Sequence, residues 1–303
     1  MKYVQNLKLE DEIDWLTQAL DSKRQDKDKL ELEKENLQKL YKKYNAIIVA
    51  FNLIPTNSNY RSIEEDSGRD KNKWSSKKMF MDYYNNPPKK LRELLTRRRR
   101  EHELTSCPYC GNPVIPTTLD HFMPKDLWAE YSMYPNNLVP QCVDCAPIKS
   151  DFYYCKASKS CLFIHPLYND LLSKIGISIT TEIIGKEKFN FRVICKYDPS
   201  IQNDELERIV LHLNKLDISN RVKDYCRRKI KTIIKEQKNK KNDIRDYIDA
   251  KLSRYSHPLN AYDNWEVAFY ASLRDEKLIT YLNDLCPKNT LAEKQEDLKE
   301  LTF

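Results

Sequence analysis

Four cysteines form the most chemically informative pattern in this sequence. They occur as two Cys-x-x-Cys pairs, C-P-Y-C at 107–110 and C-V-D-C at 142–145. Two such pairs supply four thiolates, which can surround one tetrahedral Zn²⁺. The metal would then join the two ends of a segment that is too short to form its own core. We therefore predict a structural zinc site made of Cys107, Cys110, Cys142 and Cys145.

An acid and an imidazole lie side by side between these pairs, as Asp120 and His121 in L-D-H-F. A carboxylate is a hard ligand suited to a divalent cation such as Mg²⁺. A histidine titrates near neutral pH, which suits a general base. An isolated Asp-His pair is more often a surface ion pair than an active site. Its position between two zinc knuckles favours the catalytic interpretation.

The order of these motifs resembles a known family. The run C-x-x-C, L-D-H-F-x-P-K, N-L-V-P-x-C-x-x-C and a following lysine is similar to stand-alone HNH nucleases with a zinc-knuckled ββα-metal core. The resemblance covers residues 100–165, about a fifth of the chain. It implies metal-dependent hydrolysis of phosphodiester bonds, with Asp120 binding a catalytic Mg²⁺ or Mn²⁺. It also implies that His121 is the general base and that Asn137 orients its loop.

Position 146 departs from the family pattern. The family has Asn or His there, as the second protein ligand of the catalytic cation, whereas this sequence has Ala146. An alanine methyl group cannot coordinate a cation. Either the alanine was introduced to disable cleavage, or the natural protein is impaired or takes a ligand from elsewhere. We favour the first explanation because the rest of the motif is complete, and in each case we expect poor cleavage.

Basic side chains flank the motif on both sides. The net charge is +7, but Lys89–Glu103 holds seven basic and three acidic residues, and Arg221–Lys241 holds ten and two. Such clusters attract a phosphate backbone, although solvated helix faces are the simpler explanation for a charge run. Our candidates for contact with nucleic acid are Lys125, Lys149, Arg97 and Arg98.

The composition indicates a helical protein from a reducing compartment. Of 303 residues 32% are charged and four are glycine, and five of the nine cysteines are scattered singly outside the pairs. Single cysteines argue against a disulfide framework. We see no charged-then-apolar leader and no apolar run of membrane-spanning length. A cytoplasmic protein without a membrane partner is therefore expected.

We expect a mostly α protein with a small α+β core. That core would be a ββα-metal (HNH) nuclease core with a four-cysteine zinc site, flanked by long helices and one β-hairpin. The predicted regions are an N-terminal long helix for partner docking or a coiled coil (1–55), a polar linker (56–88), the nuclease core (89–170), and a β-hairpin with a C-terminal helical region (171–303).

The expected elements follow from hydrophobic periodicity. Residues 7–51 read as one long helix, whose narrow apolar stripe needs a neighbouring helix, a coiled-coil partner or another protein. Further helices are expected at 77–84, 89–104, after the second knuckle, from 204 onward, at 222–255 and at 265–285. Extended segments are expected at 114–119, ending at Asp120 and His121, at 137–140, and as a hairpin at 175–184 and 188–196.

Two functions remain open. The first is an HNH endonuclease acting on DNA, or on RNA, since one-metal hydrolysis does not itself select the sugar. Here the resemblance extends to the nuclease subunits of Septu-type and retron-associated anti-phage systems, which implies an ATPase subunit as partner. The second is a catalytically degenerate, zinc-stabilised module for nucleic-acid binding or assembly, and Ala146 is its best support. The two differ in whether turnover depends on His121.

Overall fold

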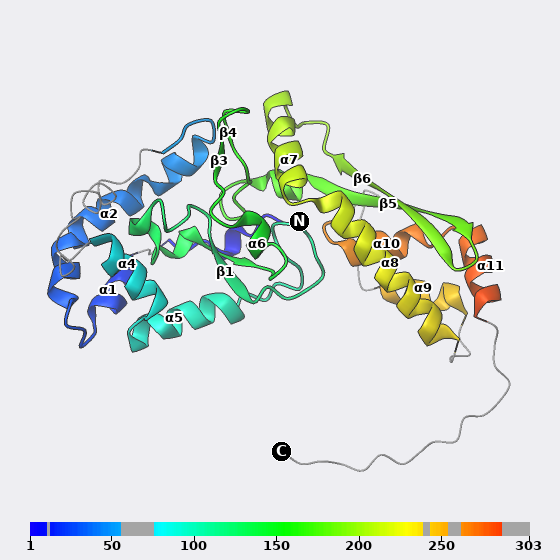
Figure 1. Cartoon of the computed structure of the whole chain (residues 1–303), viewed down its shortest axis with the longest axis horizontal. Helices are drawn as coiled ribbons and strands as arrows, with labels where there is room; N and C mark the ends of the chain where they lie inside the picture. The colour runs from blue at the N-terminus through cyan, green and yellow to red at the C-terminus, as the bar shows by residue number, and fades with distance from the viewer. Residues whose placement is uncertain (11–12, 56–75, 239–242, 254–261, 287–303) are drawn as a thin grey trace, which may run out of the picture.

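The computed structural model describes residues 1–10, 13–55, 76–238, 243–253 and 262–286. Helices make up about half of these residues, and the strands form small antiparallel sheets of two strands each. The N-terminal helices pack on one side of the cysteine-containing region, and the hairpin and C-terminal helices pack on the other side (Figure 1). Within the described residues, no helix has the length and apolar character needed to cross a membrane.

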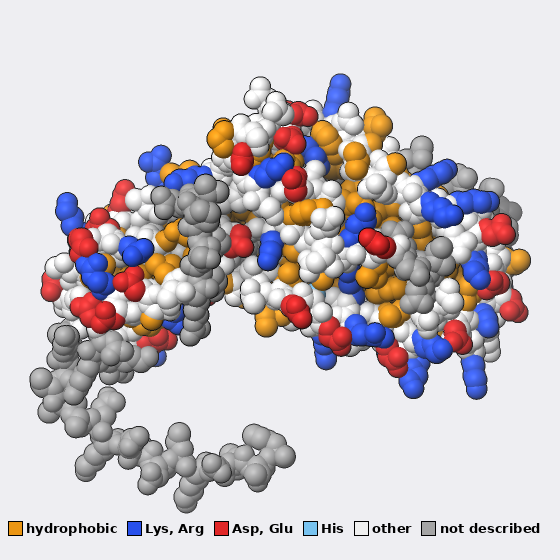
Figure 2. Space-filling model, turned by 180° about the vertical axis from the view of Figure 1, so that it is seen from behind, with side chains coloured by type: hydrophobic (Ala, Val, Ile, Leu, Met, Phe, Trp, Pro, Cys, Tyr) orange, Lys and Arg blue, Asp and Glu red, His pale blue; other side chains and the backbone are white. Residues whose placement is uncertain are grey.

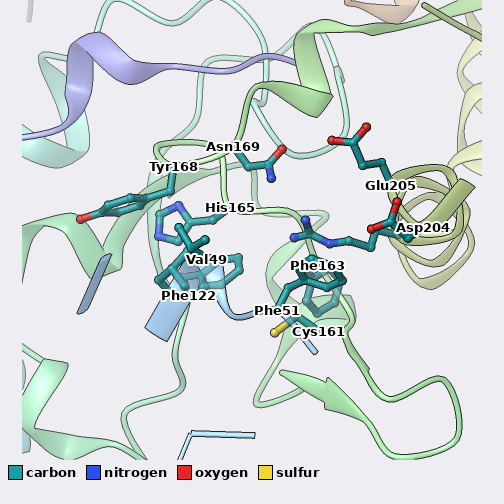
Figure 3. Close-up of a pocket in the computed structure, with 12 residues that line it drawn as sticks. Val49, Phe51, Phe122, Cys161, Phe163, His165, Tyr168, Asn169, Asp204 and Glu205 are labelled. Atoms are coloured by element: carbon teal, nitrogen blue, oxygen red, sulfur yellow. The ribbon is translucent and has the colours of Figure 1, made fainter. Parts of the chain in front are cut away.

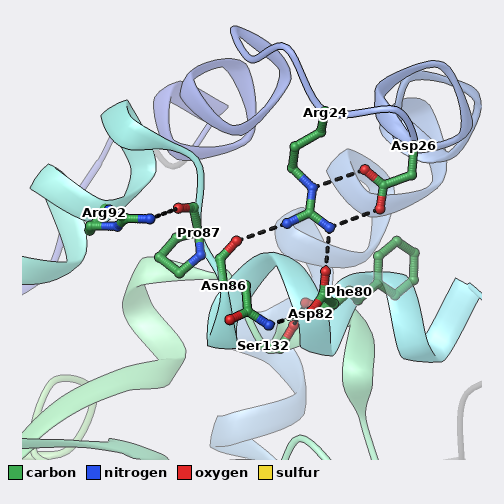
Figure 4. A network of polar contacts seen from close by, with 8 residues as sticks. All are labelled: Arg24, Asp26, Phe80, Asp82, Asn86, Pro87, Arg92 and Ser132. Atoms are coloured by element: carbon green, nitrogen blue, oxygen red, sulfur yellow. Dashed lines mark hydrogen bonds and ion pairs between the residues drawn. The ribbon is translucent and has the colours of Figure 1, made fainter.

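The N-terminal region is not the single helix that we expected over 7–51. It consists of η1 (Gln5–Leu7), α1 (Ile13–Leu20) and α2 (Lys27–Val49). The break is the connection between α1 and α2, where the side chain of Arg24 makes polar contacts (Figure 4). Its guanidinium donates to the Asp26 carboxylate at 2.9 Å and to the Asn86 carbonyl at 2.8 Å, and it also pairs with Asp82. These contacts tie the α1–α2 connection to the chain around residues 82–86.

The apolar stripe of α2 is covered by this chain itself. Its inward residues pack on two tyrosines of the core, with ring centroids 4.4 Å apart for Tyr41 and Tyr134 and 5.1 Å apart for Tyr44 and Tyr131. Of the three possibilities that the sequence left open, packing against the rest of the chain is the one observed. The stripe is therefore not a free docking surface. Its buried members are Leu30, Leu37, Tyr41, Tyr44 and Ile48.

Two shorter helices lead to the first knuckle. Helix α4 (Ser76–Asn85) matches the expected helix at 77–84, and α5 (Lys89–Arg100) ends four residues before the predicted end at 104. Although we assigned 56–88 to a polar linker, α4 buries Met79, Phe80 and Tyr83 in the core. The remainder of that predicted linker, 56–75, lies outside the described residues.

The central region contains two short antiparallel strands followed by one helical turn. Strand β1 (Thr118–His121) pairs with β2 (Leu138–Gln141), so that Asp120 lies opposite Val139. Helix α6 (Ala146–Lys149) follows the second knuckle. The strand that we expected at 114–119 begins later because Pro116 has no N–H to donate to a ladder. The smaller elements here are η2 (Ala129–Tyr131), η3 (Pro135–Asn137), β3 (Tyr154–Cys155) and β4 (Ser160–Cys161).

The C-terminal region contains the predicted hairpin and a helical layer. The helical bounds are η4 (Asp170–Ser173), α7 (Asn203–Lys215), α8 (Ile218–Gln237), α9 (Ile244–Leu252), α10 (Trp265–Ser272) and α11 (Glu276–Leu285). Strands β5 (Ile175–Gly185) and β6 (Lys188–Tyr197) confirm the hairpin, and α8 and α10 pack against it (Figure 1). The pattern at 222–255 is divided between α8 and α9, and the one at 265–285 between α10 and α11.

Candidate metal centre and adjoining pocket

The four cysteines of the two knuckles converge on one point. All are buried, and their sulfur atoms lie within 4.8 Å of one another. The Sγ atoms of Cys110 and Cys142 are 3.8 Å apart. A tetrahedral site with Zn–S bonds of about 2.3 Å requires sulfurs separated by about 3.8 Å. The cluster therefore fits a structural zinc, and it is the one group of this kind among the described residues.

A cation from the C-terminal region lies against the cluster. Arg221, from α8, directs its guanidinium at the Sγ of Cys145 at 3.4 Å and at the Sγ of Cys110 at 3.8 Å. Four thiolates around Zn²⁺ carry a net charge of −2, which a nearby guanidinium partly compensates. We had counted Arg221 in a basic run that could face nucleic acid. The structure gives it a contact with the metal-ligand sulfurs instead.

A pocket of about 180 Å³ lies at the end of β1 and the start of α6. It brings together Asp120, His121 and Lys125, which are close in sequence, with Ala146 from the helix after the second knuckle. Asp151 also lines it, and its carboxylate is exposed. We predicted no role for Asp151, which lies two residues after the end of the short helix α6.

The side chain of Asp120 is buried, and each of its two carboxylate oxygens has a polar partner. Its Oδ1 lies 3.0 Å from the ammonium of Lys149, and its Oδ2 accepts a hydrogen bond from the Tyr109 hydroxyl at 2.7 Å. Burial raises the pKa of the carboxyl group, and the positive charge of Lys149 opposes that rise. The ionised carboxylate therefore depends on the buried lysine.

Lys149 is not a free phosphate contact, which corrects our prediction. Its side chain has no solvent-exposed surface. Besides the contact with Asp120, its ammonium donates to the backbone carbonyls of His121 at 3.1 Å and Phe122 at 3.2 Å. An ammonium has three donors, and all three have acceptors here. Lys149 therefore joins α6 to the end of β1.

His121 is held as a neutral imidazole. Its Nε2 lies 3.1 Å from the Ser132 carbonyl, and its ring meets Tyr84 edge-on at 4.4 Å. Burial, and next the positive charge of Lys125, lower its pKa to about 3. Because a carbonyl only accepts, Nε2 must carry the proton, and Nδ1 is left with the lone pair. That is the protonation state required of a general base, but a pKa this far below neutral makes the imidazole a weaker base than the ordinary histidine that we expected.

Asn137 is a buried clamp for the loop after His121. Its Oδ1 accepts from the Met123 backbone N–H at 2.8 Å and from the Tyr44 hydroxyl at 2.7 Å. Its Nδ2 donates to the carbonyls of Met123 at 3.0 Å and Tyr131 at 3.1 Å. All of its hydrogen-bonding groups have partners, so the side chain fixes the 123–131 loop rather than facing a substrate.

The three remaining basic candidates, Arg97 and Arg98 before the motif and Lys125 within it, divide into one buried and two accessible residues. Arg98 is buried and donates to the carbonyls of Leu138 at 3.0 Å and Pro135 at 3.2 Å, and also to that of Leu7. It therefore cannot contact nucleic acid in this structure, which corrects our prediction. Arg97 lies on the same helix and keeps part of its side chain in solvent. Lys125 stays at the pocket rim with its ammonium 2.9 Å from Asn85 Oδ1.

Surface charge is mixed on the face of the molecule drawn in Figure 2. Lys and Arg side chains are interleaved there with Asp and Glu side chains. Along α8 the exposed charged residues are more often basic than acidic, although Asp224 and Glu236 are also exposed and Asp224 pairs with Arg227. These exposed basic residues include Arg227, Arg228, Lys231, Lys235 and, just past the end of the helix, Lys238.

The catalytic cation that the resemblance implies does not fit the pocket as it stands. Both carboxylate oxygens of Asp120 have partners, and Ala146, the first residue of α6, offers no donor atom. Apart from the cysteines, the described residues form no group of three or more Cys, His, Asp or Glu close enough to hold an ion. The pocket therefore has one engaged carboxylate, that of Asp120, and one exposed carboxylate, that of Asp151, where a cation needs several free oxygens.

Besides Asp151, three contributors to these sites were not predicted. Tyr109, which donates to Asp120, lies inside the first Cys-x-x-Cys pair, and this position was the one sequence feature that could have indicated its role. Tyr44 contacts Asn137 from a helix 93 residues earlier in the chain. Arg221 contacts Cys145 from a helix 76 residues later. No local pattern in the sequence indicates such distant contacts.

Comparison with known proteins gives one short match. Protein ea31 of Escherichia phage lambda is 46% identical to this chain over 39 residues, which is 13% of this chain and 13% of that protein. No family model matches the chain, and no solved structure matches it. The match thus spans about an eighth of each protein and does not establish a family.

Proposed function

We propose that this chain is built as an HNH-type endonuclease for DNA and that Ala146 leaves it poorly active. The observation that carries the proposal is the shared pocket of Asp120, His121 and Ala146. A longer oxygen-bearing side chain at position 146 would enter the space beside the Asp-His pair. The structural zinc, which the cysteine cluster fits, would hold the two halves of this region together.

The chain's own residues have distinct roles in this proposal. His121 accepts a proton from the attacking water through Nδ1. Asn137 positions the following loop, and Lys125 at the rim binds a phosphate oxygen. Asp120 and residue 146 would hold Mg²⁺ or Mn²⁺ in the cleaving form. Because the pocket as folded does not fit that cation, we derive no catalytic step through it.

The exposed basic face of α8 is the proposed guide for the DNA backbone. Lys and Arg residues gathered along one helix would give a salt-dependent, sequence-independent attraction. Nothing in the sequence reads bases directly, so a partner would supply specificity. An ATPase subunit of an anti-phage defence complex is the partner that the resemblance suggests, and it belongs to the same proposal.

One observation favours the degenerate module as the alternative. The Asp120–Lys149 pair already compensates the carboxylate with a protein cation at 3.0 Å. If that pair is permanent, Asp120 is a structural residue and the chain binds nucleic acid or a partner without turnover.

The test is plasmid cleavage by the Ala146→Asn variant. The variant and the chain as written are incubated with supercoiled plasmid and Mg²⁺ or Mn²⁺, with and without EDTA. The proposal predicts nicked or linear product from the variant alone, abolished by EDTA. Intact plasmid in every lane would favour the module, and DNA binding would then be measured by mobility shift.

A further inference from the structure

A second pocket lies apart from the cysteine cluster and shares no lining residue with the first. It has a volume of about 200 Å³. The C-terminal end of α2, the 161–169 segment and the start of α7 surround it (Figure 3). Its walls include the rings of Phe51, Phe122 and Phe163, and Figure 3 shows Asp204 and Glu205 on the side opposite His165 and Tyr168.

The floor of this pocket holds an arginine whose Nε has no polar partner. Arg208 is 7% exposed, and its guanidinium carbon lies 3.8 Å above the centre of the Phe51 ring. Its Nε is buried without a hydrogen bond, and the carboxylates of Glu205 and Asp204 on the same helix act on the guanidinium only through their charge. A buried N–H group without an acceptor is destabilising. An occupant that carries an acceptor would remove that cost.

Two carboxylates lie one helical turn before Arg208. Asp204 is exposed and Glu205 is half-buried, and both line the pocket. Glu205 accepts from the Gln202 backbone N–H at 3.0 Å, whereas Asp204 has no hydrogen bond or ion pair within the described part of the chain. Negative charge at this end of the pocket opposes binding of a phosphate group. It favours a ligand with a cationic group near the acidic side chains.

His165, one of the uncharged polar side chains in the wall, adds no charge, because burial lowers its pKa. His165 accepts from the Leu167 backbone N–H through Nδ1 at 3.1 Å, and its Nε2 lies 3.3 Å from the Tyr44 hydroxyl. The charged groups of the pocket are therefore one guanidinium and two carboxylates, which lie on neighbouring turns of α7 and act on one another electrostatically.

We propose that this pocket binds a small zwitterion with an apolar body, of the α-amino-acid class. The ligand's carboxylate pairs with Arg208, its ammonium lies near Asp204 and Glu205, and its apolar body packs on Phe51 and Phe122. This arrangement gives each charged group of the pocket an opposite charge and covers the aromatic rings. Because Phe122 directly follows His121, an occupant would also contact the segment that carries the proposed general base.

Thermal shift and calorimetry with L-phenylalanine and L-leucine test the proposal. Phenylalanine amide lacks the carboxylate and N-acetyl-phenylalanine lacks the ammonium, so each should bind at least about tenfold more weakly. Guanine and adenine serve as flat, neutral comparisons. We expect a dose-dependent rise in melting temperature with the amino acids. No rise up to roughly 10 mM, equal binding of the amide, or preference for a nucleobase would overturn the proposal.

Matched variants locate the site. Arg208→Met removes the guanidinium and keeps apolar bulk, and it should abolish binding. Because that variant changes a buried residue, binding is also measured for Asp204→Asn, which changes an exposed residue. Glu207→Gln on the same helix is the control. Asp204→Asn should weaken binding about tenfold while Glu207→Gln leaves it unchanged. Equal effects of these two substitutions would show that the pocket does not hold the ligand's ammonium.

Discussion

The ammonium of Lys149 lies 3.0 Å from the carboxylate of Asp120, and neither side chain is more than 8% exposed. This buried ion pair joins the helical turn after the second knuckle to the end of β1. The protein thereby supplies its own cation at the residue that the family resemblance assigns to a catalytic metal.

Lys149→Met should strongly destabilise the protein. The substitution leaves the Asp120 carboxylate buried without its partner, which costs about 3–5 kcal/mol in comparable buried pairs. Urea unfolding measures the change. The double variant Lys149→Met with Asp120→Asn should recover a large part of the loss, because no buried charge remains. A loss below about 1 kcal/mol for the single variant, the usual value for an exposed pair, would contradict the buried pair.

The cysteine cluster should hold one zinc ion per chain. Cys142→Ser should lower the zinc content measured by mass spectrometry, and it should lower the melting temperature because metal binding contributes to folding. Cys155→Ser is the matched control, since Cys155 is half-exposed and lies outside the cluster. Unchanged zinc content in Cys142→Ser would rule the cluster out as the metal site.

Substitution of Arg98 should lower the stability of the protein, whereas substitution of Arg97 should weaken DNA binding. Arg98→Met leaves buried carbonyls of Leu138 and Pro135 without their donor, so it should cost about 2–4 kcal/mol of unfolding free energy. Arg97→Met on the accessible face should change stability by less than about 0.5 kcal/mol and should weaken DNA binding at low salt. Equal stability of the two variants would show that Arg98 is not anchored as described.

Stability should fall as the pH drops below about 6.5. Burial lowers the pKa of His212 to about 4, while its hydrogen bond to the Tyr109 carbonyl acts in the opposite direction. A histidine with a depressed folded pKa contributes its full stability above the unfolded value of about 6.5, and loses it as the pH falls toward 4. This one group accounts for at most about 3 kcal/mol.

A variant can show whether His212 causes this pH dependence of stability. His212→Gln removes the titrating ring, so its unfolding free energy should depend less steeply on pH between 6.5 and 4. Zinc release is followed in parallel with a colorimetric chelator, because thiolates also protonate in acid. If the variant and the parent show the same slope before zinc is released, His212 is not a source of the pH dependence.

Regular patterns in the sequence predicted the local features well. The Cys-x-x-Cys spacing predicted the cluster, and β-branched runs on either side of Gly185 and Lys186 predicted the hairpin. These features depend on near neighbours in the chain. The helix break at Arg24 was missed because its partners Asp82 and Asn86 lie 58 and 62 residues away.

The charged residues were the hardest to predict. Lys149, Arg98 and Arg221 were grouped with solvated or DNA-facing side chains, yet each points to an acceptor inside the protein. Composition shows that a residue is charged, but burial depends on which distant carbonyl, carboxylate or thiolate the fold brings to it. The pattern of charged residues along the sequence does not show which distant acceptor each one meets.

The most direct test of the nuclease proposal places His121→Ala in the Ala146→Asn background. Plasmid cleavage with Mn²⁺ and DNA binding by mobility shift are measured together for the single and double variants. We predict that Ala146→Asn cleaves, and that adding His121→Ala abolishes cleavage while the affinity for DNA stays the same. Cleavage that persists without the imidazole would contradict the assignment of His121 as the general base and of this pocket as the active site.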